Sequence, residues 1–206
     1  MAITTYSELQ SAIGNWLNRS DLTANIPDFI ALAEADMDRR LRHWRMENRS
    51  TAVLNSQYST LPTDFIEPLR LFITSGDTYK MEAESQAQLL DRRAGAANAT
   101  GRPEYYAITS GSVEVFPSPD SDYTLEMLYV AKTNSLSVSN TSNWILQYHA
   151  DCYLYGSLVH SAPFLEEDRR LAVWGALYDK AIDAVNRENE GAKFGGSGLR
   201  VKIRSY

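Results

Sequence analysis

Histidine and cysteine are the side chains best suited to metal binding, and this chain has few of them. Three histidines, His43, His149 and His160, and a single cysteine, Cys152, occur in 206 residues. His149 and Cys152 lie three residues apart in a predicted helix, so they share a face and have a spacing that can hold a metal ion. A zinc site takes about four ligands, and the sequence offers no second His/Cys cluster. We therefore predict neither a metal site nor a cofactor.

Serine and histidine could supply a hydrolytic nucleophile and its base. His160 lies close in sequence to Ser157 and Ser161. However, the chain has no Gly-X-Ser-X-Gly elbow to expose a nucleophilic serine. The Ser110-Gly-Ser112 segment is better explained as the turn of a β-hairpin. We predict no catalytic triad.

Carboxylate pairs are the remaining candidates for acid–base chemistry. The pairs Asp36/Asp38 and Glu166/Glu167 are too close in sequence to share a helix face. We expect them to be solvated or to face a neighbouring subunit, and we expect the protein not to be an enzyme. A small hydrolase with opposed carboxylates in a cleft stays open as an alternative. So does a carbohydrate- or ligand-binding module that exposes Tyr105, Tyr106 and Tyr123 together.

The C-terminal segment has the clearest pattern in the chain. A Gly/Ser run predicts a flexible hinge, and after it apolar residues alternate strictly with basic ones, as in a β-strand. No later segment can pair with this strand, so we expect it to complete a sheet of another protein. The hinge comprises Gly195, Gly196, Ser197 and Gly198, and the docking strand comprises Leu199, Arg200, Val201, Lys202, Ile203, Arg204 and Tyr206.

The charge balance restricts the class of partner. The net charge is −6, and the segment from Gly191 onward carries four basic residues and no acid, so the body is more acidic than the whole. An acidic body disfavours sequence-specific nucleic-acid binding, whereas the basic tail suits an acidic groove on a protein. A lone cysteine fits a reducing compartment. The chain shows no signal peptide and no apolar run long enough to cross a membrane.

Four segments have the apolar spacing of amphipathic helices. Two precede residue 48 and form a predicted helical hairpin, which opens with a capping box at Thr5 and Glu8. Two follow residue 143, and we expect Pro163 to end the third helix and Gly191 to end the fourth. The predicted stripes are Tyr6, Leu9, Ile13, Trp16 and Leu17; Ile26, Ile30, Ala33, Met37, Leu41 and Trp44; Trp144, Tyr148, Cys152, Tyr155, Val159 and Ala162; and Leu171, Trp174, Tyr178, Ala181, Ile182 and Val185.

The middle of the chain predicts short strands joined by turns. Five of its seven prolines lie there, as expected where strands are frequently interrupted. One short helix is predicted over residues 84–93. The predicted strands are residues 51–54, 69–74, 105–109, 112–116 and 123–130, with a tight hairpin turn at Ser110 and Gly111.

The most economical fold for this order is α+β, with a four-helix bundle lobe, an inserted small antiparallel β-rich lobe and an extended C-terminal tail. Each helical pair alone would expose an apolar stripe, so we expect the two pairs to pack together. Residues 1–48 and 143–190 would form the helical lobe, and residues 49–132 the β-rich lobe. Residues 191–206 would form a flexible linker followed by the docking strand.

Several segments, taken in order, resemble adaptor proteins of tailed bacteriophages, also called head-completion or head-to-tail connector proteins. The opening helix carries Tyr6-Ser-Glu-Leu9, and a turn before a strand reads Leu61-Pro-Thr-Asp-Phe65. Gly101-Arg-Pro-Glu-Tyr-Tyr-Ala-Ile108, Val113-Glu-Val-Phe-Pro-Ser-Pro-Asp120 and Tyr123-Thr-Leu-Glu-Met-Leu-Tyr129 follow. The likeness covers most of the chain and rests more on this order than on any one motif.

The resemblance implies a structural role in the neck of a virion that assembles in the host cytoplasm. Similar proteins form a ring, often twelve-fold, under the portal, where they extend the DNA channel and offer a surface to tail or nozzle proteins. The implied partners are the portal protein, tail or nozzle proteins and further copies of the chain, with a dodecamer expected. Genomic DNA would pass through without sequence-specific binding, and no membrane is involved. The tail of similar proteins reaches the portal, which here corresponds to residues 195–206.

Overall fold

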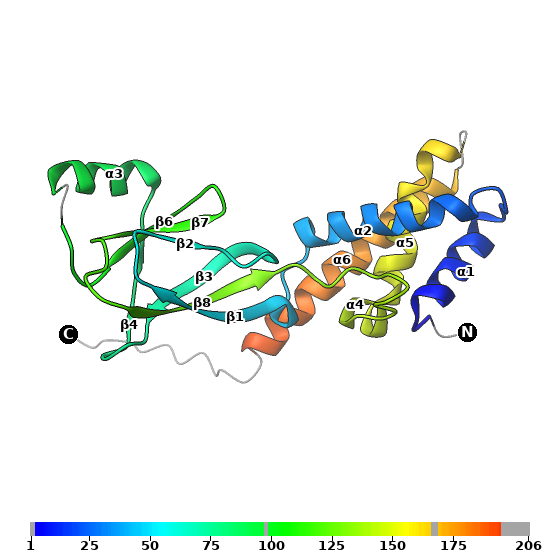
Figure 1. Cartoon of the computed structure of the whole chain (residues 1–206). Coiled ribbons are helices and arrows are strands. Elements are labelled where there is room, and N and C mark those ends of the chain that lie inside the picture. Colours follow the sequence, from blue (N-terminus) through cyan, green and yellow to red (C-terminus); the bar gives the residue numbers. More distant parts are fainter. Residues whose placement is uncertain (1–2, 97–98, 166–168, 195–206) are drawn as a thin grey trace, which may run out of the picture. The chain divides into compact units, whose positions relative to one another are not determined.

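The computed structural model describes residues 3–96, 99–165 and 169–194 and divides the chain into two compact units. The helical unit contains the chain up to Arg45 and from Thr133 onward, and the sheet unit is Met46–Lys132. Figure 1 shows helices throughout the first unit and strands with one helix in the second.

The described part of the helical unit contains five α-helices and short 3-10 turns. Its first helix opens with a capping box at Thr5 and Glu8, as predicted. The second has Pro27 in its first turn and Arg39 and Arg40 in its last, which suits the helix dipole. The elements are α1 (Tyr6–Leu17), η1 (Thr23–Asn25), α2 (Ile26–Arg40), η2 (Trp44–Met46, whose last residue belongs to the sheet unit), α4 (Trp144–Tyr148), α5 (Ala150–His160), η3 (Ala162–Phe164) and α6 (Arg170–Phe194).

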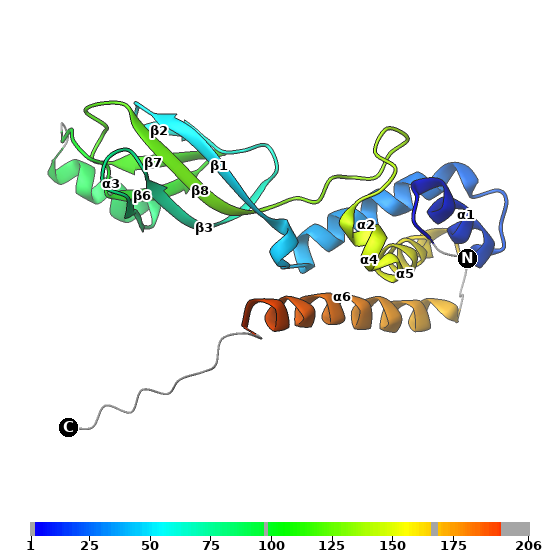
Figure 2. The same ribbon diagram turned by 90° about the horizontal axis from the view of Figure 1, so that it is seen from below.

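Helix α5 lies at the centre of this unit. It contacts α1, α2, α4 and α6, and it is buried at residues 152–154 and again at 156–158. A helix that is apolar nearly all round can be stable only where other helices cover it on several sides. Figure 2 shows α6 as the long helix of the unit, extending past α5.

Gly156 allows three helices to approach closely. A Cβ added at this position would lie 2.9 Å from the Tyr178 ring of α6 and 3.1 Å from the Ala33 Cβ of α2. The helices α2, α5 and α6 therefore meet at a point where only a hydrogen atom fits.

The predicted four-helix bundle is wrong. Instead of four amphipathic helices around a shared core, the described helical unit has a short buried helix surrounded by the others. The predicted helix that starts at Trp144 is broken at His149, whose φ and ψ of −139° and 51° are not helical. The β part is also larger than expected and not purely antiparallel, since the short strand at Glu82 pairs in parallel with its neighbour.

Two helix ends differ from the prediction. Helix α2 ends at Arg40 because Leu41 adopts an extended conformation, which removes Trp44 from the predicted stripe. Helix α6 passes Gly191 and continues to Phe194. An isolated glycine weakens a helix only by about 1 kcal/mol, so it does not have to end one.

The sheet unit contains two four-stranded sheets and one helix. The first sheet has the strand order β1-β8-β3-β4 and the second β2-β7-β6-β5. The elements are β1 (Glu47–Leu54), β2 (Tyr58–Thr60), β3 (Phe65–Ile73), β4 (Tyr79–Lys80), β5 (Glu82–Ala83), α3 (Gln86–Gly95), β6 (Tyr105–Thr109), β7 (Ser112–Phe116) and β8 (Tyr123–Ala131).

The two sheets share one apolar core. Leu71 and Met127 of the first sheet belong to the same buried cluster as Val113 and Val115 of the second. Helix α3 covers the other face of the second sheet, where Leu89 packs with Ala107 and Phe116. The unit is thus layered as sheet, sheet and helix.

Local sequence signals account well for these strands. The hairpin turn between β6 and β7 is confirmed, with Ser110 and Gly111 both at positive φ. Pro68 lies inside β3 next to a shift in the register with β8, and β4 pairs with β3 only at Phe72 and Ile73. A proline is tolerated in a strand where one edge is unpaired and the register shifts.

A buried carboxylate connects α3 to the second sheet. Glu114 of β7 is 2% exposed. It accepts hydrogen bonds from Gln57 at 2.8 Å and Gln86 at 2.6 Å, and it pairs with Arg93 at 3.1 Å. Burial acts to raise the pKa of Glu114, but these hydrogen bonds and the arginine charge outweigh it and lower the pKa.

Because three helices meet closely at Gly156, we expect a change from glycine to alanine to destabilise the protein at this position but not at Gly175. Gly156→Ala should lower the free energy of unfolding of the helical unit by about 1–2 kcal/mol, because overpacking outweighs the better helix propensity. Gly175→Ala is the matched control, since no atom lies within 4 Å of its added Cβ, and it should raise stability by up to about 1 kcal/mol. Urea unfolding followed by tryptophan fluorescence measures this unit alone, because Trp16, Trp44, Trp144 and Trp174 all lie in it. Equal effects of the two substitutions would contradict the crossing.

The Glu114 network predicts local loss of structure in the sheet unit. Glu114→Gln removes the carboxylate that pairs with the partly buried Arg93 and should cost about 2–3 kcal/mol. The control Glu126→Gln removes a carboxylate whose partner, Arg49, is 68% exposed, and it should change stability by less than about 1 kcal/mol. Hydrogen exchange of peptides covering α3 and β7 measures both. Unchanged protection in Glu114→Gln would refute the role of the network.

Candidate functional site

The residues predicted to bind a partner lie outside the described part of the chain. This applies to the hinge, Gly195–Gly198, and to the docking strand, Leu199–Tyr206. The closest described structure is the C-terminal half of α6, from which the tail continues.

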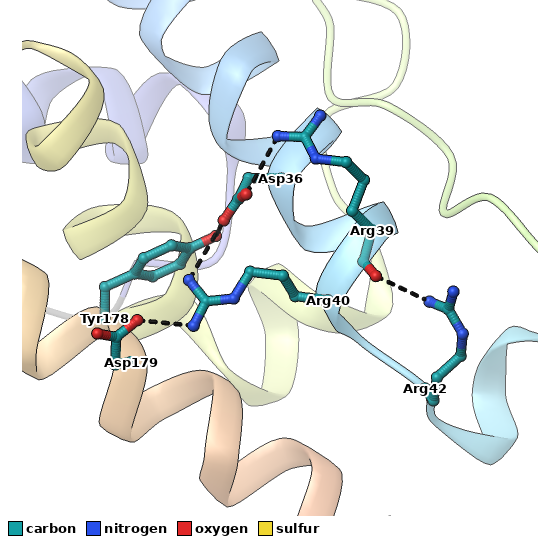
Figure 3. Close-up of polar contacts among 6 residues, drawn as sticks. All are labelled: Asp36, Arg39, Arg40, Arg42, Tyr178 and Asp179. Atoms are coloured by element: carbon teal, nitrogen blue, oxygen red, sulfur yellow. Dashed lines mark hydrogen bonds and ion pairs between the residues drawn. The ribbon is translucent and has the colours of Figure 1, made fainter.

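An ion-pair network joins the middle of α6 to α2 (Figure 3). Asp36 accepts a hydrogen bond from the Tyr178 hydroxyl at 3.0 Å and pairs with Arg40 at 3.4 Å. Arg40 also pairs with Asp179 of α6 at 2.6 Å. Arg39 adds a hydrogen bond to Asp36 at 3.1 Å. The two helices are thus connected by charges as well as by apolar packing.

The pKa directions agree with this geometry. Burial acts to raise the pKa of Asp36, but hydrogen bonds from Tyr178 and Arg39 and the charge of Arg40 outweigh it and lower the pKa. Burial and the Asp36 charge raise the pKa of Tyr178. The tyrosine therefore stays protonated and donates to an ionised carboxylate.

Two asparagines of α6 hold the chain where α2 ends. Asn186 accepts from the backbone N–H of Arg42 at 2.9 Å and donates to the carbonyl of Arg40 at 3.2 Å. Asn189 accepts from the backbone N–H of Trp44 at 2.8 Å. Residues three apart share one face of a helix, so a single face of α6 supplies both contacts. They fix the path of residues 40–44 against the end of α6.

This segment contains a buried histidine. His43 is 2% exposed and stacks on Trp144, with ring centroids 4.8 Å apart. Its Nδ1 accepts from the backbone N–H of Arg45 at 3.2 Å, so the neutral ring must carry its proton on Nε2. Burial lowers the pKa of His43, while Glu188 opposes the shift.

Trp44, Arg45 and Tyr148 form a stack at the surface, which we call the arginine clamp. The Arg45 guanidinium carbon lies 4.6 Å from the Trp44 ring centroid and 4.3 Å from that of Tyr148. Trp44 is 42% exposed and Tyr148 61% exposed. The sequence analysis missed this site because it placed Trp44 and Tyr148 on apolar stripes. The helices break at Leu41 and at His149, and both rings then face outward. Neither break has a strong helix-stop signal in the local sequence.

The described residues contain no group of three or more His, Cys, Asp or Glu side chains that could hold an ion. Cys152 is fully buried, and burial raises its pKa to about 12. A thiol of this kind is neither a good metal ligand nor a nucleophile. His149 instead lies 3.5 Å from Glu188.

The serine and histidine candidates are not arranged for catalysis. Ser157 is fully buried, with no hydrogen-bond partner for its hydroxyl. Ser161 is also buried, and its hydroxyl donates to the carbonyl of Leu158. Burial lowers the pKa of His160, and no hydrogen bond joins it to either serine among the described contacts.

Two surface pockets beside α1 contain few groups that could act in catalysis. The larger, of about 640 Å³, is lined mainly by small polar residues, and its one charged group, Arg19, pairs with Asp21. The other, of about 430 Å³, contains Glu8 as its one charged group. Hydrogen bonds from Thr4 and Thr5 in the capping box lower the pKa of Glu8 to about 2, so it cannot act as a general acid near neutral pH.

The tyrosines proposed for a binding module are not exposed together. Tyr106 is 6% exposed and belongs to the core between the sheets. Tyr105 and Tyr123 are half-buried, and Arg92 lies 3.7 Å above the Tyr105 ring. These rings therefore do not form one open aromatic platform.

The buried histidines predict that acid weakens the helical unit. Because the pKa values of His43 and His160 are lowered by burial, the unfolded chain takes up protons below about pH 6.5 before the folded chain does. Stability should therefore fall as the pH falls from 6.5 toward the folded pKa values, by up to about 1.4 kcal/mol per pH unit for each histidine. Urea unfolding between pH 7.5 and 5.5 measures the slope. His43→Gln and His160→Gln should each reduce it, and an unchanged slope in both would contradict the prediction.

In the described residues, we find no helix both long and apolar enough to cross a bilayer. A comparison with curated proteins gives no match. The family model described as the SU10 adaptor protein matches residues 4–201, which include all described residues but Ile3 and reach into the predicted docking strand. The resemblance to phage adaptor proteins is thereby confirmed at the level of the family. Because the match spans nearly the whole chain, the protein belongs to the SU10 adaptor protein family.

Proposed function

We propose that this protein is a structural adaptor that forms a ring under the portal of a tailed phage. In this role it extends the DNA channel and joins the head to tail or nozzle proteins in the neck of the virion. The observation that carries the proposal is the family match over residues 4–201, combined with the alternating basic and apolar pattern of residues 199–204.

The contacts of α6 support a docking role for the tail. A tail can transmit force between two proteins only if its root is fixed. Asp179, Asn186 and Asn189 tie residues 179–189 of α6 to the end of α2 and the segment that follows it. The proposed docking strand therefore continues from a helix that is firmly held by its own unit.

The energetics favour many tails acting together. Burying Leu199, Val201 and Ile203 would contribute about 1.5–3 kcal/mol each. Ordering about eight backbone residues would cost about 1–2 kcal/mol each, so one tail binds weakly through burial alone. Backbone pairing and charge-assisted contacts of the basic residues would add to it. A ring raises the effective concentration of every further tail once one has docked.

The charge of the protein supports passage of DNA. The net charge is −6, because 26 acidic residues outnumber 20 lysines and arginines. A negatively charged body repels phosphates and would let a duplex slide past without being held. We propose that genomic DNA is a passing cargo and that the ring is a dodecamer.

Deletion of residues 195–206 tests the docking role. The truncated protein should keep its thermal unfolding temperature, because the described contacts of both units lie before residue 195, and it should lose binding to capsids that carry the portal. Cosedimentation with such capsids measures this. Two matched triple variants separate the contributions of the two faces of the strand. Leu199→Ser/Val201→Ser/Ile203→Ser removes the apolar face. Arg200→Gln/Lys202→Gln/Arg204→Gln removes the basic face. Normal attachment of the truncated chain would refute the docking role.

A further inference from the structure

The arginine clamp is an exposed cation held between two exposed rings. The Arg45 guanidinium carbon lies 4.6 Å from the Trp44 ring centroid and 4.3 Å from the Tyr148 ring centroid. Aromatic rings stabilise a guanidinium through its flat face and leave its N–H edges free. The arrangement thus fixes the plane of the guanidinium while its donors stay available.

The backbone under the clamp is fixed before any partner binds. The N–H of Trp44 donates to Asn189, and the N–H of Arg45 donates to buried His43. His43 in turn stacks on Trp144. A side chain held in its binding geometry loses little conformational entropy when a ligand arrives.

The clamp lacks an anion within the described structure. Several other arginines of the chain have carboxylate partners there: Arg40 pairs with Asp179, Arg92 with Glu84 and Arg93 with Glu114. For Arg45, the described contacts of the side chain are the two rings alone. Carboxylates match the fork of a guanidinium with two parallel hydrogen bonds.

We propose that the arginine clamp binds a carboxylate on the protein that receives the tail. The inference rests on the proposed function and adds a second contact to it. Trp, Tyr and Arg are also the residue types that most often dominate protein–protein binding energy. Docking would then use two elements of each subunit, the strand and the clamp.

The short spacing between the clamp and the end of α6 favours one partner for both the clamp and the docking strand. Asn189, which holds Trp44, precedes Phe194 by five residues, or about 7.5 Å along α6. The four hinge residues can span at most about 14 Å. The start of the proposed strand would therefore lie within about 22 Å of Asn189, which favours a partner surface that also reaches the clamp. Both elements are basic, so one acidic surface suits them together.

Duplex DNA is a poorer fit for the clamp. Binding to the phosphate backbone gains its strength from several cations acting together. A carboxylate on a partner protein needs only the one oriented arginine.

Substitutions of Arg45 test the inference on the full-length protein, with portal-bearing capsids that lack it as the probe. Arg45→Gln should weaken cosedimentation with these capsids about ten-fold or more, since a charge-assisted pair is lost. Tyr148→Phe keeps the ring face and should change binding less than about two-fold. Arg19→Gln is the matched control, because it removes the same charge from another exposed site, and it should also leave binding within about two-fold.

Crosslinking identifies the group that the clamp contacts. Arg45→Lys places an amine in the clamp, and a carbodiimide should join it to a carboxylate of the capsid partner. Peptide mass spectrometry should find that link in Arg45→Lys and not in Arg45→Gln. A link to a second copy of this chain would overturn the inference, as would unchanged capsid binding in Arg45→Gln. Loss of duplex DNA affinity in Arg45→Gln with capsid binding retained would likewise overturn it.

The tail deletion separates this inference from the proposed function. If deletion of residues 195–206 abolishes capsid binding while Arg45→Gln has no effect, the docking strand stands and the clamp fails. If the deletion leaves capsid binding intact, the proposed function and the inference that rests on it both fail. An unchanged circular dichroism spectrum of each variant would show that it is folded, so that a loss of binding comes from the altered surface.

Discussion

The attachment of α6 to the end of α2 is the constraint on which the other features of the helical unit depend. Gly156 brings the two helices together through α5, and the Asp36 network fixes their relative position. Because α2 stops at Arg40, its last carbonyl and the next N–H groups need partners. Asn186 supplies them from α6. The same contacts that satisfy a helix end therefore also place the root of the tail and the arginine clamp.

In each unit, a partly or fully buried carboxylate holds a neighbouring segment in place. Glu34 of α2 accepts from the backbone N–H of Leu136 at 2.7 Å and from the Tyr153 hydroxyl at 2.9 Å, and burial raises the pKa of Glu34. Glu114 does the same for α3 in the sheet unit. A buried charge is costly unless it is fully hydrogen-bonded, so each carboxylate selects one arrangement of the segments around it. A protein that binds partners through its surface needs one defined conformation of that surface.

Sequence reasoning predicted the local elements well and the packing poorly. The capping box at Thr5 and the turn at Ser110-Gly111 are short-range signals, so both were found. The four-helix bundle failed because the break at His149 depends on tertiary packing around Trp144 and His43. Apolar periodicity cannot tell a buried central helix from a peripheral one when both have many apolar residues. The clamp was missed for the same reason, since Trp44 and Tyr148 fit an apolar stripe in the sequence.

The energetics of the proposed docking explain why a second kind of contact would be useful. Burial of three apolar residues would gain about 4.5–9 kcal/mol, which is less than the roughly 8–16 kcal/mol that ordering about eight residues costs, so a single tail would bind weakly through burial alone. A cation near the start of the proposed tail would add affinity without ordering further chain, because the backbone N–H groups of Trp44 and Arg45 are already bound to Asn189 and His43. In the proposed ring, weak contacts of two kinds, repeated in each subunit, would give strong attachment to a symmetric partner and little attachment to a single stray protein. The tail would then supply reach, and the clamp would supply orientation.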